Sequence, residues 1–591
     1  MKKETIRKLK ITFIVLFFAA SLMPLVLMPW FGNQEAESEE ADVRLKPLFA
    51  AGKLDTAALI GTTGGSNPDG GSSSGAGSSF LESAGDYFAK KFALRREMVT
   101  AGDLIKAKVF GVSGQDGVVV GRKGYLFYKD SFNDYLGRDE LTDYEVASLS
   151  YNIQLMQDEL EAQDIDFLFT VAPNKNSLYP ELMPSRYRPN VSKRNMTRLK
   201  PLLERSDVNY LDLYELFNDI DEVMYLKGDS HWNNTGAALV AGEIVSALGR
   251  ERMSYDDGRS EIRKDFYGDL TAMLYPAGSK DKAAGSTGGN KKTAGTAGSN
   301  EIASGKTNSF ADEQVYYDKM DSSVYNERVE VSTLNDETGE LETTDIMARP
   351  DWSTESEIVT ESYSGADGTL LMIRDSFGNS LTPWMAEEFG EALFLNGTPY
   401  DIGRAADEGY GTVVFETVER NLDRLISDAP VISTTDQCIT TEDMSLLDKL
   451  LAPDVTREKY AGSLEMAPSD SEFDYTYVQG TLDPELTDDD SKVCLVLQSK
   501  DTGETEYHAL FRVSTSKAAG GSGKNENGSS NAGGTGKTDA ADSGKIPGCA
   551  AYLKTEDLPE GSFDLHLAYT KNGEWRVTDT LGEYDSEQAG E

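Results

Sequence analysis

Short continuous apolar runs alternate with amphipathic stretches between about Phe80 and Ile426. The apolar runs predict buried strands, and the amphipathic stretches predict helices between them. The strands are expected at Ile165–Val171, Val208–Leu213, Thr369–Arg374 and Thr412–Glu416, and the helices at Tyr144–Ala162, Thr235–Leu248 and Val418–Ile426. Such alternation is typical of an α/β fold in which helices cover both faces of a parallel sheet. Active residues of such sheets lie at the carboxyl ends of the strands.

The pattern changes to period two beyond about residue 473, with turns such as Lys571–Gly573 between the segments. Alternating segments occur at Tyr475–Gln479, Val493–Gln498, His508–Ser514, Cys549–Leu553, Phe563–Tyr569 and Glu574–Thr578. Period two predicts strands with one buried face. We therefore expect an accessory antiparallel β-sandwich of about six strands over residues 440–591.

The segment Ile11–Phe31 is apolar and carries no charge, whereas residues 1–10 are basic and acidic residues follow. At about 1.5 Å per residue it spans a hydrocarbon core of about 30 Å. The basic flank predicts a cytoplasmic tail and a single transmembrane helix in the cell membrane, with the remaining chain extracytoplasmic. A cleaved signal peptide is the alternative, although its apolar stretch usually has about 7–15 residues.

Three tracts without aromatic residues, Gly61–Ser79, Ala277–Ser309 and Ala518–Lys545, consist mostly of small and polar residues. Such composition buries too little apolar surface to offset chain entropy, so we expect disorder. The first tract belongs to a low-complexity spacer over residues 32–79. The other two are expected as insertions, at 277–309 in an α/β domain over residues 80–430 and at 518–545 in the sandwich.

The 57 basic and 100 acidic side chains give a net charge of −43, which disfavours nucleic acid as a partner. Only three His and three Cys occur in the chain, so we expect no zinc or haem site, and no cofactor is implied. The three cysteines, Cys438, Cys494 and Cys549, form at most one disulfide.

Two polar segments carry the candidate chemistry. His231 is the only histidine before residue 500, and Asp229 stands two positions earlier, where its carboxylate could hold Nδ1–H and leave Nε2 as a base. Ser376 follows the predicted strand Thr369–Arg374, at a turn where helix amides could stabilise an oxyanion. A structural histidine and a helix N-cap are the alternatives. Together the three residues form a set suited to acyl transfer.

These segments resemble the DHHW proteins and the alginate O-acetyltransferase domain of the AlgX and AlgJ type, over about residues 80–430. The resemblance lies in Gly228–Asn233 with Gly236, Arg374–Gly378, Val120–Phe127, Ala172–Lys175 with Tyr179–Glu181, Tyr267–Leu270 and Glu416–Arg420. It implies an SGNH-hydrolase-like fold in which Asp229, His231 and Ser376 are the triad. The chain departs from the family in having Ser230 where the family name records a histidine, and in its Gly-rich insertions.

Further site candidates surround this set. The amide of Ser376 is the first candidate oxyanion donor, and Asn174 and Arg420 are placed to reach the site, although capping and surface roles stay open. Lys175 and Tyr179 are candidates for a sugar groove or for shaping the loop. Trp232 is a candidate for packing under the histidine or for a substrate contact.

The leading hypothesis is an anchored extracytoplasmic O-acetyltransferase that modifies a cell-surface polysaccharide through an acyl-enzyme. The resemblance also implies a multipass membrane O-acyltransferase as the acetyl donor. An O-acetyl esterase with the same triad is the nearest alternative, because water in place of the sugar gives hydrolysis. A non-catalytic glycan-binding envelope protein is the third.

Overall fold

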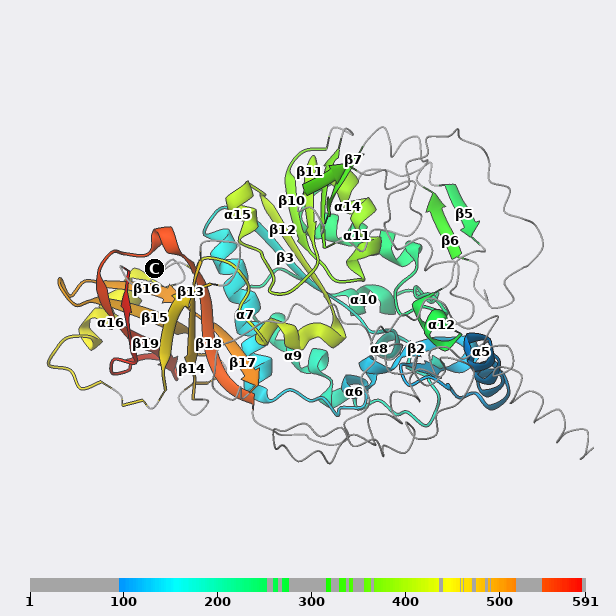
Figure 1. Cartoon of the computed structure of the whole chain (residues 1–591), viewed down its shortest axis with the longest axis horizontal. Helices are drawn as coiled ribbons and strands as arrows, with labels where there is room; N and C mark the ends of the chain where they lie inside the picture. The colour runs from blue at the N-terminus through cyan, green and yellow to red at the C-terminus, as the bar shows by residue number, and fades with distance from the viewer. Residues whose placement is uncertain are drawn as a thin grey trace, which may run out of the picture. The chain divides into compact units, whose positions relative to one another are not determined.

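The computed structural model describes most of the chain beyond residue 94 (Figure 1). The described residues are 95–251, 259–263, 268–275, 315–319, 329–335, 340–343, 356–362, 366–434, 439–457, 459–460, 462–469, 475–483, 487–488, 490–516 and 545–586. The expected anchor, the spacer and almost all of the two Gly-rich insertions lie outside these ranges. Within the described part of the chain, none of the helices is long and apolar enough to cross a membrane.

The chain divides into two compact units. One comprises residues 1–115 and 271–306, and its described part contains α5 (Arg95–Ile105) followed by a π-helix over Lys106–Phe110. The other comprises residues 116–270 and 307–591 and contains the central sheet and the sandwich.

The larger unit is built on an eight-stranded sheet. Its strands, in spatial order, are β4 (Tyr210–Leu211), β3 (Asp166–Ala172), β12 (Thr412–Val418), β10 (Thr369–Ile373), β11 (Glu391–Leu395), β9 (Glu357–Ser362), β7 (Val329–Asn335) and β8 (Glu340–Thr343). The first five are mutually parallel, and β9, β7 and β8 extend the sheet in antiparallel fashion. The expected parallel sheet is therefore confirmed for one part of a mixed sheet.

Alternate residues of each parallel strand face opposite cores. Leu370 and Met372 of β10 pack in one core, and Leu371 and Ile373 in the other. Helices complete both faces: α10 (Leu213–Asn218), α11 (Asn234–Ala247) and α14 (Thr382–Glu388) on one, and α7 (Asp143–Glu161) and α9 (Asn195–Leu203) on the other. Burial on both sides explains why these strands are continuously apolar.

One predicted helix lies within one residue of its expected bounds, and two other predicted elements required correction. A capping box at Thr142, which accepts from the Glu145 amide, starts α7 close to its expected position. The expected strand Val208–Leu213 shrinks to two paired residues because Asp212 caps α10. The expected helix Val418–Ile426 is a 3₁₀ helix, η9 (Glu419–Ile426), and it begins one residue later because β12 runs to Val418 in register with β3.

The carboxyl-terminal region forms two antiparallel sheets, which confirms the expected class of fold. One contains β13 (Leu464–Pro468), β14 (Tyr475–Thr481), β18 (Lys545–Lys554) and β17 (Phe511–Ser516). The other contains β16 (Thr505–Ala509), β15 (Val493–Ser499), β19 (Ser562–Lys571), β20 (Glu574–Val577) and β21 (Gly582–Asp585). The expected six strands were too few. The segment predicted as one strand, His508–Ser514, breaks at Leu510 and joins both sheets.

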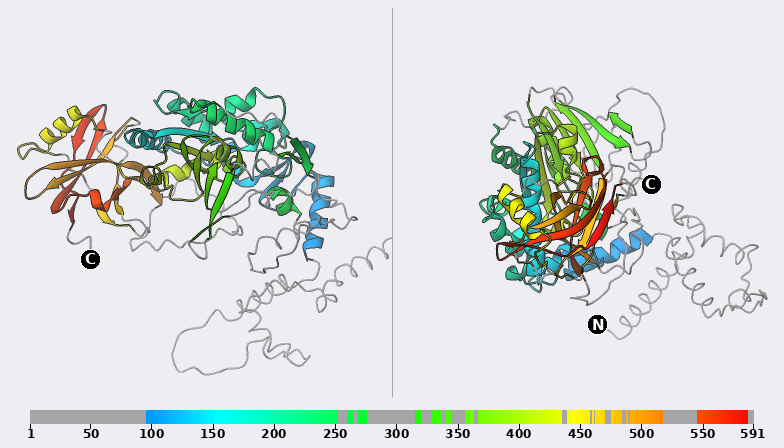
Figure 2. Two further views of the ribbon diagram at one scale, coloured as in Figure 1. Left: turned by 90° about the horizontal axis from the view of Figure 1, so that it is seen from above. Right: turned by 90° about the vertical axis from the view of Figure 1, so that its left-hand side faces the viewer.

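The sandwich packs directly on the α/β part through α7, as Figure 2 also shows. Phe511 and Val513 of β17 share a hydrophobic core with Ile153 of α7 and Phe415 of β12. The Tyr151 hydroxyl of α7 donates to the Leu510 carbonyl at 3.1 Å. Because the core is continuous, the two parts form one packed body.

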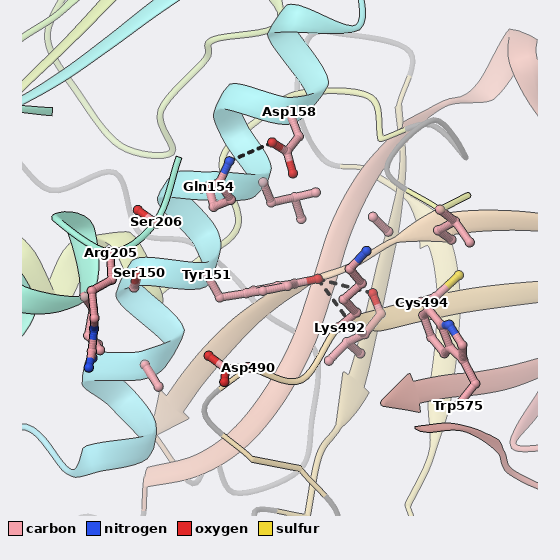
Figure 3. Close-up of a pocket in the computed structure, with 16 residues that line it drawn as sticks. Ser150, Tyr151, Gln154, Asp158, Arg205, Ser206, Asp490, Lys492, Cys494 and Trp575 are labelled. Carbon is pink, nitrogen blue, oxygen red and sulfur yellow. Dashed lines mark hydrogen bonds between the residues drawn. The ribbon is translucent and has the colours of Figure 1, made fainter. Parts of the chain in front are cut away.

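A crevice of about 670 Å³ with a mixed polar and apolar lining lies at this junction (Figure 3). Tyr151 and Gln154 line it from α7, and Lys492 and Cys494 line it from the side of β15. None of the candidate catalytic residues lines it.

Among the described residues, Cys494 and Cys549 are thiols buried in the sandwich and form no disulfide, and Cys438 lies outside the described ranges.

Candidate active site

Ser376 stands on a tight turn directly after β10. Asp375 braces this turn: its Oδ1 accepts from the Phe377 amide at 2.8 Å, and its Oδ2 accepts from the Val418 amide at the end of β12, also at 2.8 Å. Glycine is required at position 378, because the Arg374 side chain lies so close that a Cβ there would be 2.4 Å from Arg374 Cβ. The turn is thus fixed to the carboxyl edge of the sheet, where α/β folds carry their sites.

His231 stands on a narrow loop that precedes α11. The loop closes where Tyr225 and Trp232 form an antiparallel bridge, with the Leu226 amide donating to the His231 carbonyl at 3.0 Å. Asn233 caps α11 by accepting from the Gly236 amide at 2.8 Å. A cap and a bridge on either side hold the imidazole in a defined place.

The two segments bring the three expected residues together. His231 Nε2 lies 2.8 Å from Ser376 Oγ, and His231 Nδ1 lies 2.7 Å from Asp229 Oδ1. The His231 side chain is 25% exposed and that of Asp229 is 10% exposed, so the imidazole reaches solvent while its carboxylate is covered. This arrangement can transfer a proton from the hydroxyl to the imidazole, while the carboxylate stabilises the resulting cation.

Charge and burial compete at this pair. Burial opposes the charged form of each group, but the attraction between them and their hydrogen bond outweigh it. The pKa of Asp229 is therefore lowered, and the pKa of His231 is raised above the usual 6.5. A raised pKa makes His231 the stronger base once it is neutral.

Asp269 is a second carboxylate beside the pair, and sequence reasoning did not single it out. Its backbone amide donates to Asp229 Oδ2 at 2.8 Å, and its Oδ2 lies 3.9 Å from His231 Nδ1. Burial first, and then the charge of Asp229, raise the pKa of Asp269. The only sequence signal for Asp269 was its place in Tyr267–Leu270, one of the stretches that resemble the family. Gly268 permits the approach, because a Cβ there would meet the Gly228 carbonyl at 2.4 Å.

Ser230, which stands where the family name records a histidine, binds Asp269. The Ser230 amide donates to Asp269 Oδ1 at 2.8 Å, and the hydroxyl donates to Oδ2 at 2.5 Å. The departure from the family pattern thus leaves the contacts of Asp229 and His231 in place.

Asn174 and Arg420 lie at the ends of neighbouring strands. Arg420 Nη1 donates to Asn174 Oδ1 at 3.3 Å, and the guanidinium lies over the ring of Phe377, 5.5 Å from its centroid. Asn174 is 2% exposed, and its side-chain Nδ2 makes no hydrogen bond with the described residues. A buried donor without a partner is costly, so Nδ2 is a candidate hydrogen-bond donor to a bound group.

Tyr128, at the end of β2 (Leu126–Tyr128), was also missed by sequence reasoning. The Arg420 guanidinium lies 5.4 Å from the centroid of its ring. Burial first, and then Asp130, raise the pKa of Tyr128 to about 12, so the phenol stays a neutral hydrogen-bonding group. It directly follows the family-like stretch Val120–Phe127, which was its only sequence signal.

The three remaining candidates are buried and bonded to the protein. Lys175 Nζ donates to the carbonyls of Leu126 at 2.8 Å and Leu226 at 2.7 Å, and also to that of Asp229. The Tyr179 hydroxyl accepts from the Met224 amide at 3.0 Å. Trp232 is 1% exposed, and its Nε1 donates to Ser380 Oγ at 2.6 Å. These contacts favour loop-shaping roles over substrate contact for all three.

One group of described side chains offers metal ligands. Asp229, His231 and Asp269 each present a ligand atom, and these atoms lie within 4.8 Å of one another. A cation there would occupy the groups that hold and orient the imidazole, so it would compete with the base.

Comparison with known proteins finds a family match for the part of the chain that includes Asp229 and His231, but not Ser376. Residues 118–296 match the family described as SGNH hydrolase-like domain, acetyltransferase AlgX. The chain is 22% identical over 200 residues to the probable alginate O-acetylase AlgJ of Pseudomonas putida, covering 33% of this chain and 51% of that protein. It is 24% identical over 167 residues to its counterpart in Pseudomonas aeruginosa, covering 27% and 40%. The chain thus spans about half or less of the length of the curated relatives it matches.

Solved structures resemble the chain more distantly. Bacillus cereus PatB1 is 18% identical, with a TM-score of 0.37 over 52% of this chain and 96% of that one. A DHHW family protein from Eubacterium siraeum is 13% identical, with a TM-score of 0.34 over 52% and 94%. The family match and the AlgJ relatives confirm the resemblance to the AlgX and AlgJ type and an SGNH-like α/β fold.

Proposed function

We propose that the chain is a serine-dependent O-acetyltransferase that modifies an extracytoplasmic polysaccharide, with Ser376 as nucleophile, His231 as base and Asp229 as orienting carboxylate. The observation that carries the proposal is the 2.8 Å contact between His231 Nε2 and Ser376 Oγ, because a base must be within hydrogen-bonding reach of the proton it removes. The AlgX-type family match supports acetyl transfer as the reaction.

In the first step, Nε2 of His231 takes the proton of the Ser376 hydroxyl as Oγ attacks the carbonyl carbon of an acetyl donor. The carbonyl oxygen becomes an oxyanion, and Asp229 stabilises the imidazolium. When the oxyanion collapses, the bond to the donor oxygen breaks and His231 returns the proton to that leaving group. The products are acetyl-Ser376 and the deacylated donor.

In the second step, a sugar hydroxyl replaces the donor. His231, neutral again, takes the hydroxyl proton as the sugar oxygen attacks the acetyl carbonyl. Collapse of the second oxyanion breaks the bond to Oγ, and the proton passes to Ser376. The sugar leaves as an O-acetyl ester, and the enzyme is restored.

The proposal assigns the oxyanion to the amide of Ser376 and to Asn174 Nδ2, with Arg420 nearby as a fixed positive charge. Support for Asn174 comes from its unused donor and from its burial. Charge that develops beside such groups is stabilised without reorganisation, and this stabilisation accounts for much of the rate enhancement in many acyl transfers.

The setting of the reaction is part of the proposal. The apolar, charge-free segment Ile11–Phe31 with its basic flank supports a single-pass anchor that leaves the site outside the cytoplasm. A membrane O-acyltransferase that exports acetyl groups is proposed as donor, on the family resemblance alone.

An O-acetyl esterase is the second candidate, favoured by the 25% exposure of His231, which leaves the base open to water. A chromogenic acetyl ester, with and without an oligosaccharide acceptor, separates the candidates. Transfer of acetyl to the oligosaccharide by the wild-type ectodomain, and not by Ser376→Ala, supports the transferase. Ser376-dependent release of acetate that the acceptor does not divert supports the esterase. Equal inactivity of both proteins supports a glycan-binding role.

A further inference from the structure

Glu419 carries a buried carboxylate that the proposed chemistry does not use. It is the first residue of η9, directly after β12, and its side chain is 0% exposed. Its Oε2 accepts from the backbone amide of Asn174 at 3.0 Å, and its Oε1 accepts from Arg194 Nη2 at 2.5 Å. Burial would raise the pKa of this carboxyl, but the Arg194 charge and hydrogen bond outweigh it and lower the pKa. Glu419 is therefore a buried anion at neutral pH.

Arg194 is the counter-ion and is anchored on its own side. It precedes α9 directly, and its side chain is 8% exposed. Its Nη2 also donates to the Tyr214 hydroxyl at 3.3 Å, and its Nε lies 3.9 Å from Asp134 Oδ2. Since α6 (Phe132–Tyr135), α10 and η9 each contribute a group, the guanidinium is fixed from three elements.

The carboxylate of Glu419 is connected to both side chains on the proposed oxyanion side of the site. It holds Asn174 through the backbone amide, and Arg420 is the next residue in the chain. Arg420 in turn donates to Asn174 Oδ1. A displacement of Glu419 would therefore move both groups relative to Ser376, and a misplacement of about 1 Å can cost about 10²-fold in rate.

We propose that Glu419 is a positioning residue that fixes Asn174 and Arg420 beside Ser376, with Arg194 as its buried counter-ion. The inference rests on the proposed function, since it concerns how that site is held. Glu419 acts through Asn174 and makes no contact with substrate. Its effect should thus fall on the transition state rather than on substrate binding.

The test must separate the lost hydrogen bond from the cost of an unpaired buried charge. Removing Glu419 alone leaves the Arg194 guanidinium buried without a partner, which destabilises a protein strongly. Two double variants remove the guanidinium as well: Arg194→Met with Glu419→Gln, and Arg194→Met with Glu419→Leu. Asp134 loses its Arg194 contact in both, so that cost cancels in the comparison. Both lack the ion pair, but only the Gln amide oxygen can accept from the Asn174 amide.

The ectodomain variants are compared on a chromogenic acetyl ester, with circular dichroism and thermal unfolding as checks of the fold. We expect kcat of the Leu double variant to be about 10- to 100-fold below that of the Gln double variant, with KM unchanged within about twofold. Equal kcat in the two folded double variants would overturn the inference. A change in KM alone would do the same.

A single variant covers the case in which the Leu double variant does not fold. Glu419→Asp keeps the charge opposite Arg194 but withdraws the acceptor by one methylene, so kcat should fall about tenfold with KM retained. A wild-type kcat in this variant overturns the inference. Wild type and Ser376→Ala are run alongside: if both are inactive, the proposed function fails and the inference with it, whereas an active wild type confines any failure to Glu419.

Discussion

His231 Nε2 lies 2.8 Å from Ser376 Oγ, although the two residues are 145 positions apart in the chain. The contact depends on two rigid supports, the turn that Asp375 ties to β12 and the loop closed by the Tyr225–Trp232 bridge. Because neither support includes the Gly-rich tracts, the pair is held by the sheet and its adjoining loops.

Replacing the nucleophile should remove activity and leave the fold intact. Ser376→Ala should lower kcat/KM for an acetyl ester by about 10³-fold or more, because the attacking oxygen is lost. Ser380→Ala is the control on the same turn: it removes the acceptor of Trp232 Nε1 but leaves the nucleophile, so its rate should stay within about tenfold of wild type. Wild-type turnover by Ser376→Ala would refute the assignment.

The pH dependence should follow the raised pKa of His231. The neutral imidazole is the active base, so kcat/KM should rise with pH along an acid limb centred above 6.5 and then level off. Asp269→Asn removes a charge that raises this pKa but keeps the Asp229 contact, so the limb should move to lower pH with a small change in plateau. A pH–rate profile of Asp269→Asn measures this shift. An acid limb that stays in place, or moves to higher pH, would contradict the prediction.

Asp229→Asn should change the pH–rate profile, and above all its plateau, more than Asp269→Asn does. It removes the main charge that raises the pKa of His231 and weakens the hold on Nδ1, so the acid limb should move down and the plateau should fall by about 10²- to 10⁴-fold. An unchanged plateau would mean that the carboxylate does not orient the base.

The unused donor of Asn174 gives a further prediction. Asn174→Asp keeps an oxygen for Arg420 but removes the Nδ2 donor, and Asn174→Ala removes both. If Nδ2 stabilises the oxyanion, both variants should lose about 10²- to 10³-fold in kcat with little change in KM. If kcat falls in Asn174→Ala but not in Asn174→Asp, Asn174 contributes by accepting the hydrogen bond of Arg420 and not through Nδ2.

Substitution of Lys175 tests whether this residue supports the loop or binds the substrate. Lys175→Met removes the ammonium that binds the carbonyls of Leu126 and Leu226, so we expect the free energy of unfolding to fall by about 1.5–3 kcal/mol. KM for an oligosaccharide acceptor should hardly change, because Nζ is directed into the protein. Denaturant unfolding and acceptor titration measure the two effects, and a large rise in KM with unchanged stability would restore the sugar-groove role.

The sequence predicted the parallel part of the fold well because the burial pattern there is local. The continuous apolar runs at β3, β10 and β12 require burial on both faces, and this requirement appears within each run. The parallel strand β11 and the antiparallel strands β7, β8 and β9 were not predicted, and the antiparallel strands mix polar and apolar residues instead of forming a continuous apolar run. The break at Leu510 depends on a partner in another strand, which local periodicity does not report.

Residue type and order along the chain predicted part of the candidate site. Roles that depend on long-range contacts could not be predicted from the sequence. His231 and Ser376 stood out as a rare residue and a strand-end hydroxyl. Asp269 and Glu419 lie in family-like stretches, but they belong to common acidic residue types in a chain with 100 acidic side chains, so their contacts were needed to assign them a role. The buried positions of Lys175 and Trp232 depend equally on packing that composition does not encode.

Detection of acetyl-Ser376 is the most direct test of the account. The wild-type ectodomain is mixed with a chromogenic acetyl ester, quenched in acid within the first turnover, digested and analysed by mass spectrometry, beside His231→Ala and Ser376→Ala. The account predicts one acetyl group on the Ser376 peptide of the wild type, strongly reduced labelling in His231→Ala and none at this peptide in Ser376→Ala. Turnover by the wild type with acetyl on another residue, or with none on Ser376 at any quench time, would contradict it.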